Sequence, residues 1–211
     1  MSNTRDNILS ALRRSVHEQY EMPDLDGLKP ITFADPVAEF NQKTTTTAGA
    51  SLKEVADITD LNAIVRTIAE NLHPSGEIGE GIVIASNLPG IDARLNPDTV
   101  GEALQLCRAD IGVVQGTIGV AENACIWIPQ TMKERAVCFA SEHLVIVLHA
   151  DNIVNNMHEA YARIEASADY FRDYPFGTFI SGPSKTADIE GALVYGAQAA
   201  RAVTVVLVNS K

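Results

Sequence analysis

Two stretches of this sequence hold residues that could carry out chemistry, and one of them is FISGPSKTADIEGAL, at residues 179–193. A glycine, a lysine and two hydroxyl-bearing residues are typical of loops that bind phosphate. Here they are Gly182, Ser184, Lys185 and Thr186. Gly177 and Gly182 have the spacing of a Walker A loop, but two residues separate Gly182 from the lysine. One of them, Pro183, also removes a backbone donor. The stretch is therefore a poor candidate for ATPase chemistry.

A weaker anion site remains open at the same place. The apolar spacing from Ile189 to Gly196 predicts a helix directly after the loop, and the free N–H groups and dipole at its start would favour negative charge. Gly182, Ser184 and Thr186 would then form the cradle, with Lys185 as charge partner and Asp188 in the first turn. Alternatively, Ser184 or Thr186 only caps the helix and Asp188 complements its dipole.

The second stretch is GVVQGTIGVAENACIWIPQ, at residues 112–130. A turn at Gly116 and the pair Glu122 and Asn123 interrupt apolar runs, which places a carboxylate and an amide at a strand boundary. Glu122 could act as a base, a nucleophile or a hydrogen-bond acceptor. It could equally cap the backbone N–H groups of a neighbouring segment. Cys125 and Trp127 alternate, so they share one face of a strand and should be core.

Composition excludes several classes of function. The net charge of -11 and the pI near 4.8 disfavour nucleic acid as a partner. No apolar run is long enough to cross a bilayer, and the start MSNTRDN lacks the apolar segment of a signal peptide. We therefore expect a cytoplasmic protein without membrane insertion.

The metal-binding residue types show no ligand spacing. The three cysteines form no C-x-x-C pair, and the five histidines are scattered along the chain. We expect the cysteines, Cys107, Cys125 and Cys138, to be buried free thiols. The sequence thus predicts neither a metal site nor a cofactor.

Periodicity gives the fold class. Helices are predicted within the first twenty residues, with Val16 on the apolar face, and near 36–44, 60–72, 98–107 and 151–166. Buried strands are predicted at 81–86, 109–116, 124–129, 143–149, 177–182 and 202–208. This alternation predicts an α/β domain at residues 49–211 with an open, mostly parallel sheet and helices on both faces, after a helical extension and linker at 1–48. In such sheets, ligands bind at the carboxyl ends of the strands.

Both stretches resemble the lactate-utilisation protein C family, also called LUD-domain proteins. TFISGPSKTADIEGALVYG followed by an arginine and VVLV is similar to the family's C-terminal signature, and VAENACIWI is similar to its A-I-A-E-T-G-T motif. Glu122 then falls on the family's glutamate, and Arg135 with His143 on an arginine and a downstream histidine. Two loops depart from the family. Asn123-Ala124 replaces Thr-Gly, and Gly196-Ala197-Gln198-Ala199-Ala200-Arg201 replaces G-V-H-G-P-R.

The resemblance implies a fold like that of ribose-5-phosphate isomerase, glucosamine-6-phosphate deaminase and CoA transferases. It also implies a non-redox accessory role in bacterial conversion of L-lactate to pyruvate, alongside separate iron-sulfur subunits. The alternative is an enzyme or binding protein for a phosphorylated or carboxylated metabolite or a CoA ester, with Glu122 as base or nucleophile and Lys185 or Arg135 as charge partner. A homo-oligomer is compatible with either role.

Overall fold

The computed structural model describes residues 3–15, 20–21, 23–24, 27–72, 81–167, 176–188 and 191–209. Contacts divide the chain into two units, residues 1–30 and 31–211, so the sequence-based boundary at residue 48 falls inside the second. The first unit holds helix α1 (Thr4–Ser15), in which no residue is buried. This confirms the first predicted helix, although Val16 lies outside the described residues.

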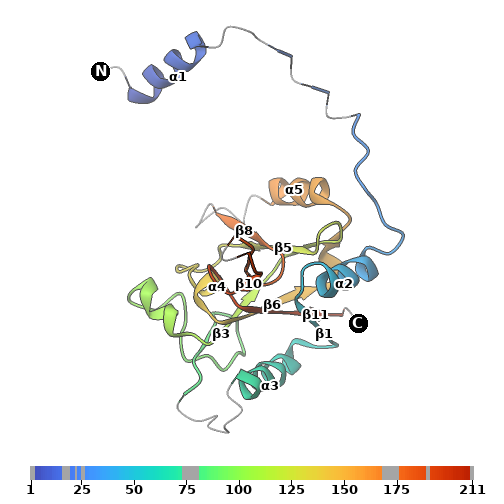
Figure 1. The fold of residues 1–211 in the computed structure, drawn as a ribbon, viewed down its shortest axis with the longest axis vertical. Coiled ribbons are helices and arrows are strands. Elements are labelled where there is room, and N and C mark those ends of the chain that lie inside the picture. Colours follow the sequence, from blue (N-terminus) through green and yellow to red (C-terminus); the bar gives the residue numbers. More distant parts are fainter. Residues whose placement is uncertain are drawn as a thin grey trace. The chain divides into compact units, whose positions relative to one another are not determined.

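A five-stranded parallel sheet forms the centre of the second unit (Figure 1). Its strands lie in the order β1 (Ser51–Val55), β11 (Ala202–Val208), β6 (His143–His149), β3 (Ile111–Gln115) and β2 (Ile84–Ala85). The interior strands β6 and β11 are almost entirely buried runs of aliphatic residues, as expected where both faces of a sheet are covered. The predicted α/β class with a mostly parallel sheet is therefore confirmed.

Helix α3 (Leu61–Leu72) covers one face of this sheet, after the 3₁₀ turn η1 (Ile58–Asp60). Leu61, Val65 and Ala69 recur every fourth residue and pack against valines of β3, β6 and β11. The helix predicted from Asp60 is thus confirmed within one residue.

A second sheet of four strands packs against the other face. Its order is β7 (Ile153–Val154), β4 (Ile118–Val120), β5 (Cys125–Pro129) and β8 (Gly177–Ile180). The pairs β4–β5 and β5–β8 are antiparallel, and Ile126 and Ile128 of β5 join Leu144 and Leu207 in the core between the sheets. The sequence predicted β5 and β8 as strands, but it did not predict that they belong to a separate sheet.

Two further helices complete the layers. Helix α2 (Pro36–Thr46), capped by Asp35, buries Phe40 in the inter-sheet core. Helix α5 (Met157–Ala166) covers the outer face of the second sheet with Ala160 and Ile164. The helix predicted from 151 begins six residues later, because η3 (Ala150–Asn152) and β7 come first. Near 98–107 the structure has the 3₁₀ helix η2 (Ala103–Arg108), and a short α4 (Val137–Ala140) precedes β6.

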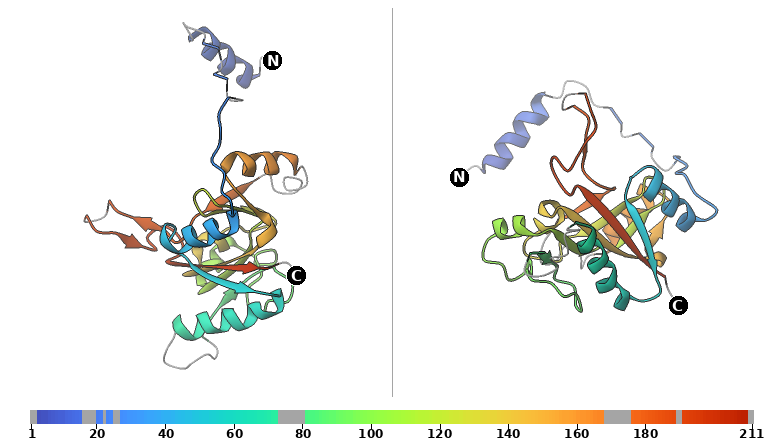
Figure 2. Two further views of the ribbon diagram at one scale, coloured as in Figure 1. Left: turned by 90° about the vertical axis from the view of Figure 1, so that its right-hand side faces the viewer. Right: turned by 60° about the horizontal axis from the view of Figure 1, so that its bottom comes forward.

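The helix predicted after residue 184 is wrong. This segment forms a β-hairpin of β9 (Lys185–Thr186) and β10 (Val194–Tyr195), which projects from the rest of the second unit (Figure 2). Gly191 and Gly196 have φ of +69° and +82°, values that a right-handed helix does not use. Ile189, predicted on the helix face, lies outside the described residues. In the described part of the chain, no helix is long and apolar enough to cross a membrane.

Candidate functional site

Glu122 lies in the turn between β4 and β5, and its carboxylate caps helix α5. Its Oε2 accepts a hydrogen bond of 3.0 Å from the backbone N–H of Met157, the first residue of the helix. The backbone of Glu122 is held as well, because its N–H donates to the carbonyl of Asn155 and its carbonyl accepts from the Lys43 ammonium. The carboxylate therefore meets the positive end of a helix dipole. The sequence left open whether Glu122 acts as a base, a nucleophile or a cap. In the structure, its carboxylate makes a capping hydrogen bond.

The next two residues keep this turn tight. Asn123 Oδ1 accepts from the backbone N–H of Cys125 at 3.1 Å, and the Asn123 carbonyl accepts from Ser181 Oγ at 2.9 Å. Ala124 is the only non-glycine residue with positive φ in the described chain, at 54°. It stands where the resembled motif has glycine, the residue that adopts this conformation most easily.

The loop at residues 181–185 is clamped onto the end of helix α2. Gly182 has φ of +69°, and a Cβ at this position would lie 2.1 Å from the carbonyl oxygen of Ala48. Only glycine permits so close an approach. Lys185 Nζ donates to the carbonyls of Thr47 and Ala48, which follow the last turn of α2. The lysine thus satisfies helix-end carbonyls and complements the negative end of the dipole.

Ser184 closes the base of the hairpin. Its N–H donates to the Ala200 carbonyl at 2.9 Å, its carbonyl accepts from the Gly196 N–H at 3.1 Å, and its Oγ accepts from the Gln198 N–H at 3.4 Å. Thr186 is the register partner of Val194 in the hairpin. Since no helix starts here, the helix-dipole basis for an anion cradle is removed.

Asp188 follows β9, outside any helix, so it has no dipole to complement. Among the described residues, it makes no hydrogen bond or ion pair. Its predicted place in the first turn of a helix is therefore wrong.

Together these contacts join three segments that are far apart in sequence. Ser181 meets Asn123 at one end of the 181–185 loop, and Ser184 meets Gln198 and Ala200 at the other. The structure therefore brings the glutamate turn, the 181–185 loop and the 196–201 loop into one continuous region.

A cavity of about 380 Å³, here called the motif cavity, lies between the last two of these loops. Residues 179–185 form one side and residues 198–200 another, while Leu144 and Val203 of the parallel sheet form its floor. Phe139 and Gln198 line it and also line a second cavity, so the two cavities are neighbours.

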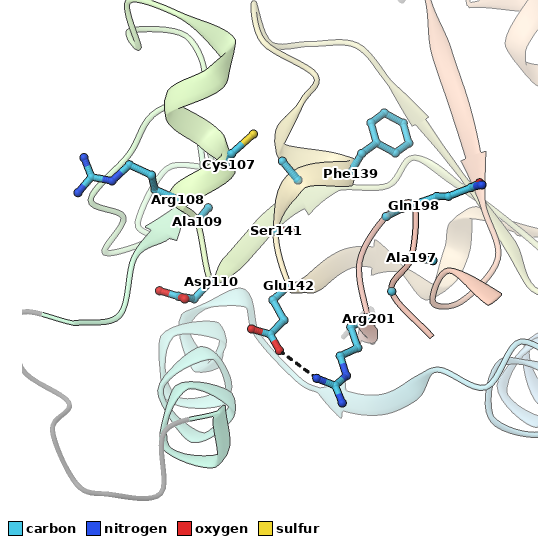
Figure 3. A pocket seen from close by; sticks show the side chains of 13 residues that line it. Cys107, Arg108, Ala109, Asp110, Phe139, Ser141, Glu142, Ala197, Gln198 and Arg201 are labelled. Atoms are coloured by element: carbon cyan, nitrogen blue, oxygen red, sulfur yellow. Dashed lines mark ion pairs between the residues drawn. The ribbon is translucent and has the colours of Figure 1, made fainter. Parts of the chain in front are cut away.

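The second cavity, here called the edge cavity, has a volume of about 510 Å³ and lies at the amino ends of β3, β6 and β11. Figure 3 shows Asp110 and Glu142 at adjacent strand starts, with Glu142 directed toward Arg201 and Asp110 pointing away from both. Arg201 Nη1 lies 3.8 Å from Glu142 Oε1, and the Asp110 carboxylate accepts from the Val83 N–H at 2.7 Å. Both cavities thus lie at the amino edge of the sheet, whereas the sequence analysis placed the ligand cleft at the carboxyl ends.

Two of the predicted site residues have other surroundings. A Cβ at Gly116 would lie 2.3 Å from Ile126 Cγ2, so this glycine permits close packing of the two sheets. The Arg135 guanidinium lies over the Phe176 ring at 4.3 Å. That ring precedes Gly177, at one end of the β5–β8 ladder, whereas Asn123 and Ser181 meet at the other end. Arg135 is therefore not brought together with Glu122.

The thiols and His143 differ in their surroundings. Burial raises the pKa of both Cys125 and Cys138 to about 12, whereas Cys107 is exposed, which corrects the prediction that all three are buried. Burial lowers the pKa of His143, whose Nε2 lies 2.8 Å from Thr204 Oγ1. No group of three or more His, Cys, Asp or Glu side chains among the described residues could hold a metal ion.

Sequence reasoning missed the polar residues of the edge cavity, Asp110 and Glu142. Asp110 is the second residue of the strand predicted at 109–116, and Glu142 directly precedes the strand predicted at 143–149; a charged residue at the start of a buried strand was the available signal. It missed Lys43 because that lysine reaches Glu122 from 79 residues away.

Comparison with known proteins agrees with this picture. Lactate utilization protein C of Shouchella clausii (strain KSM-K16) is 24% identical over 174 residues, which span 82% of this chain and 74% of that protein. The crystal structure of a DUF162 family protein from Deinococcus radiodurans superposes with a TM-score of 0.58 at 17% identity, covering 85% of this chain and 99% of the other, which supports the fold. The profile of the LUD domain matches residues 100–208, just over half of the sequence. The chain therefore belongs to the LUD domain family.

Proposed function

We propose that this protein is a non-redox accessory subunit of an L-lactate utilisation system and works alongside separate iron-sulfur subunits. The similarity to a protein named lactate utilization protein C supports the metabolic context. The accessory role rests on one observation, namely that both charged motif residues, Glu122 and Lys185, make structural contacts. Glu122 is committed to the start of α5, and Lys185 to the end of α2.

These contacts hold three loops in place instead of leaving charged groups free for a reaction. A carboxylate that acts as a base must reach the proton that it removes, and a charged lysine must face its substrate. Here both groups are bound to backbone atoms of neighbouring helices. What the arrangement presents outward is the projecting hairpin, with Leu193 and Tyr195 about half exposed (Figure 2). Exposed apolar side chains on a projecting element suit contact with another protein.

Co-purification tests this proposal directly. The tagged protein is isolated from its native host grown on L-lactate, and everything recovered with it is quantified by mass spectrometry. We expect iron-sulfur oxidation subunits in near-equal amounts. Recovery of the protein alone would contradict the accessory role.

Two matched variants sharpen the result. Leu193→Asp places a charge on the hairpin, and we expect it to abolish the association. Leu104→Asp places the same charge on an exposed leucine of η2, and it should leave the association intact.

The motif cavity favours a second candidate function, the binding of a phosphorylated or carboxylated metabolite or a CoA ester. Hydroxyl-bearing residues and a lysine line it, namely Ser181, Ser184 and Lys185. Glu122 does not itself line this cavity. Its part in such a function is tested in a deletion strain complemented with Glu122→Gln, after circular dichroism has shown that the variant folds. Loss of growth on lactate despite an intact fold would support a reactive or ligand-binding role for Glu122, and full complementation would count against it.

A further inference from the structure

A third cavity lies on the opposite face of the parallel sheet, between helix α3 and the first residues of β1, β11 and β6. Its volume is about 520 Å³, close to the 510 Å³ of the edge cavity. Cavities of this size hold small organic molecules. We call it the α3 pocket; His143 lines it, but neither Glu122 nor any residue of the 181–185 loop does.

The floor of the α3 pocket is polar. Ser51 and Thr204 are register partners on neighbouring parallel strands, and His143 Nε2 lies 2.8 Å from Thr204 Oγ1. Lys53 stands two residues beyond Ser51, so both side chains project toward α3. Within the described part of the chain, the Lys53 ammonium makes no hydrogen bond or ion pair. The floor therefore offers one free cation beside two hydroxyls.

The opposite wall is apolar. It consists of Ile64, Ile68 and Leu72, which recur every fourth residue along α3. They lie beside the buried residues of the same helix, Leu61, Val65 and Ala69. Under α3, the neighbouring strands supply valines such as Val145 and Val206, whereas β1 supplies Val55 only at its end and has the exposed residues Ser51 and Lys53 before it. Ser51 and Lys53 therefore line the hollow beside the helix.

We infer that the α3 pocket binds a monocarboxylate with an aliphatic chain. A carboxylate accepts hydrogen bonds from the Lys53 ammonium and the Ser51 hydroxyl, and the chain packs along Ile64 and Ile68. A single cation matches a single negative charge better than the double charge of a phosphate monoester. An amine is excluded as the head group, because Lys53 repels it.

The α3 pocket is separate from the motif cavity, although both adjoin the same strands. Leu144 and Val203 face the motif cavity, while His143 and Thr204, their immediate neighbours in sequence, face the α3 pocket. Side chains of a strand alternate between the two faces of a sheet. This inference therefore does not rest on the proposed lactate role, and either can fail alone.

The first experiment titrates the full chain with sodium octanoate, butyrate and octylamine, and follows binding by calorimetry and by the melting temperature. We expect saturable binding of octanoate, with affinity falling about fourfold for each methylene removed toward butyrate. Octylamine should not bind. Equal binding of octylamine, or no saturable binding of octanoate, would overturn the inference.

Variants place the ligand in the pocket. Ile68→Trp fills the apolar side, and Lys53→Met removes the cation while keeping a similar length. We expect the first to abolish octanoate binding and the second to weaken it about tenfold. Lys133→Met is the matched control, since Lys133 lies outside the pocket and its loss should leave affinity unchanged. Should circular dichroism show that Ile68→Trp is unfolded, Lys53→Met decides the matter, and wild-type affinity in that variant refutes the assignment.

Discussion

The carboxylate of Glu122 accepts a hydrogen bond from the backbone N–H of Met157, 35 residues further along the chain. One contact thereby joins the turn of the second sheet to the helix that covers that sheet. Removing it should cost what a lost helix cap costs. We predict that Glu122→Ala lowers the free energy of unfolding by about 1 kcal/mol. Urea denaturation measures this directly.

Glu165→Ala is the matched control, because Glu165 lies near the other end of α5, where a negative charge opposes the helix dipole. That variant should be neutral or slightly more stable. If both variants lose the same free energy of unfolding, the hydrogen bond to Met157 does not stabilise the fold as we predict.

Ala124 holds a left-handed backbone conformation with φ of 54°. Glycine adopts this conformation without the steric cost that a Cβ imposes, so Ala124→Gly should stabilise the fold by up to about 1 kcal/mol. Ala121→Gly, in the same turn but without positive φ, should destabilise it. Thermal unfolding of the two variants distinguishes these signs, and a loss in both would refute the argument.

Gly182 and Gly191 form a natural pair for measuring the clamp on α2. Both have φ of +69°, but a Cβ at Gly182 would lie 2.1 Å from the Ala48 carbonyl oxygen, whereas one at Gly191 would meet nothing within 4 Å. Gly191→Ala should cost only the backbone strain, about 1 kcal/mol. Gly182→Ala should cost about 3 kcal/mol or more, because backbone must move. Equal losses of stability would show that the close approach to Ala48 is dispensable.

His143 predicts a pH dependence. Because burial lowers its pKa from the ordinary value of 6.5, the unfolded chain binds the proton more tightly than the folded chain does. Its contribution to stability is therefore complete above pH 6.5 and is lost as the pH falls through the lowered pKa. His143→Gln should flatten this part of the stability profile in denaturation series between about pH 4 and pH 8. An unchanged slope would show that another group titrates.

The thiols should react in two classes. Cys107 is exposed, whereas Cys125 and Cys138 are buried with pKa values raised to about 12, so neither buried thiol is ionised near neutral pH. A thiol-specific disulfide reagent should label one cysteine quickly and the other two only after unfolding. Cys107→Ser should abolish the fast phase, and a fast phase that persists would contradict this assignment.

Local patterns in the sequence predicted the long elements well. The parallel strands β6 and β11 are mostly aliphatic and buried, and the four-residue repeat of Leu61, Val65 and Ala69 marks α3 clearly. The helix after residue 184 was wrong because its apolar spacing competes with two glycines of positive φ, Gly191 and Gly196, which close a hairpin instead. The spacing of apolar residues alone does not show that these glycines favour a hairpin over a helix.

The site was harder to predict because its contacts are long-range. Whether Glu122 is reactive or capping depends on Met157, and the role of Lys185 depends on carbonyls 137 and 138 residues away. The short strands β4 and β7, of three and two residues, carry too little pattern to reveal a second sheet. The sequence predicted the six segments that contain β2, β3, β5, β6, β8 and β11, but it missed β1, β4 and β7 and did not predict which strands pair.

The position of β11 also bears on how the chain assembles during synthesis. This strand, at residues 202–208, lies between β1 and β6 and pairs with both. Until the ribosome has released it, β1 has no neighbour in the parallel sheet, and β6 has only β3. A nascent chain therefore exposes two unpaired strand edges until residues 202–208 have left the ribosome, and exposed edges of this kind are a condition under which chaperones protect a protein from aggregation.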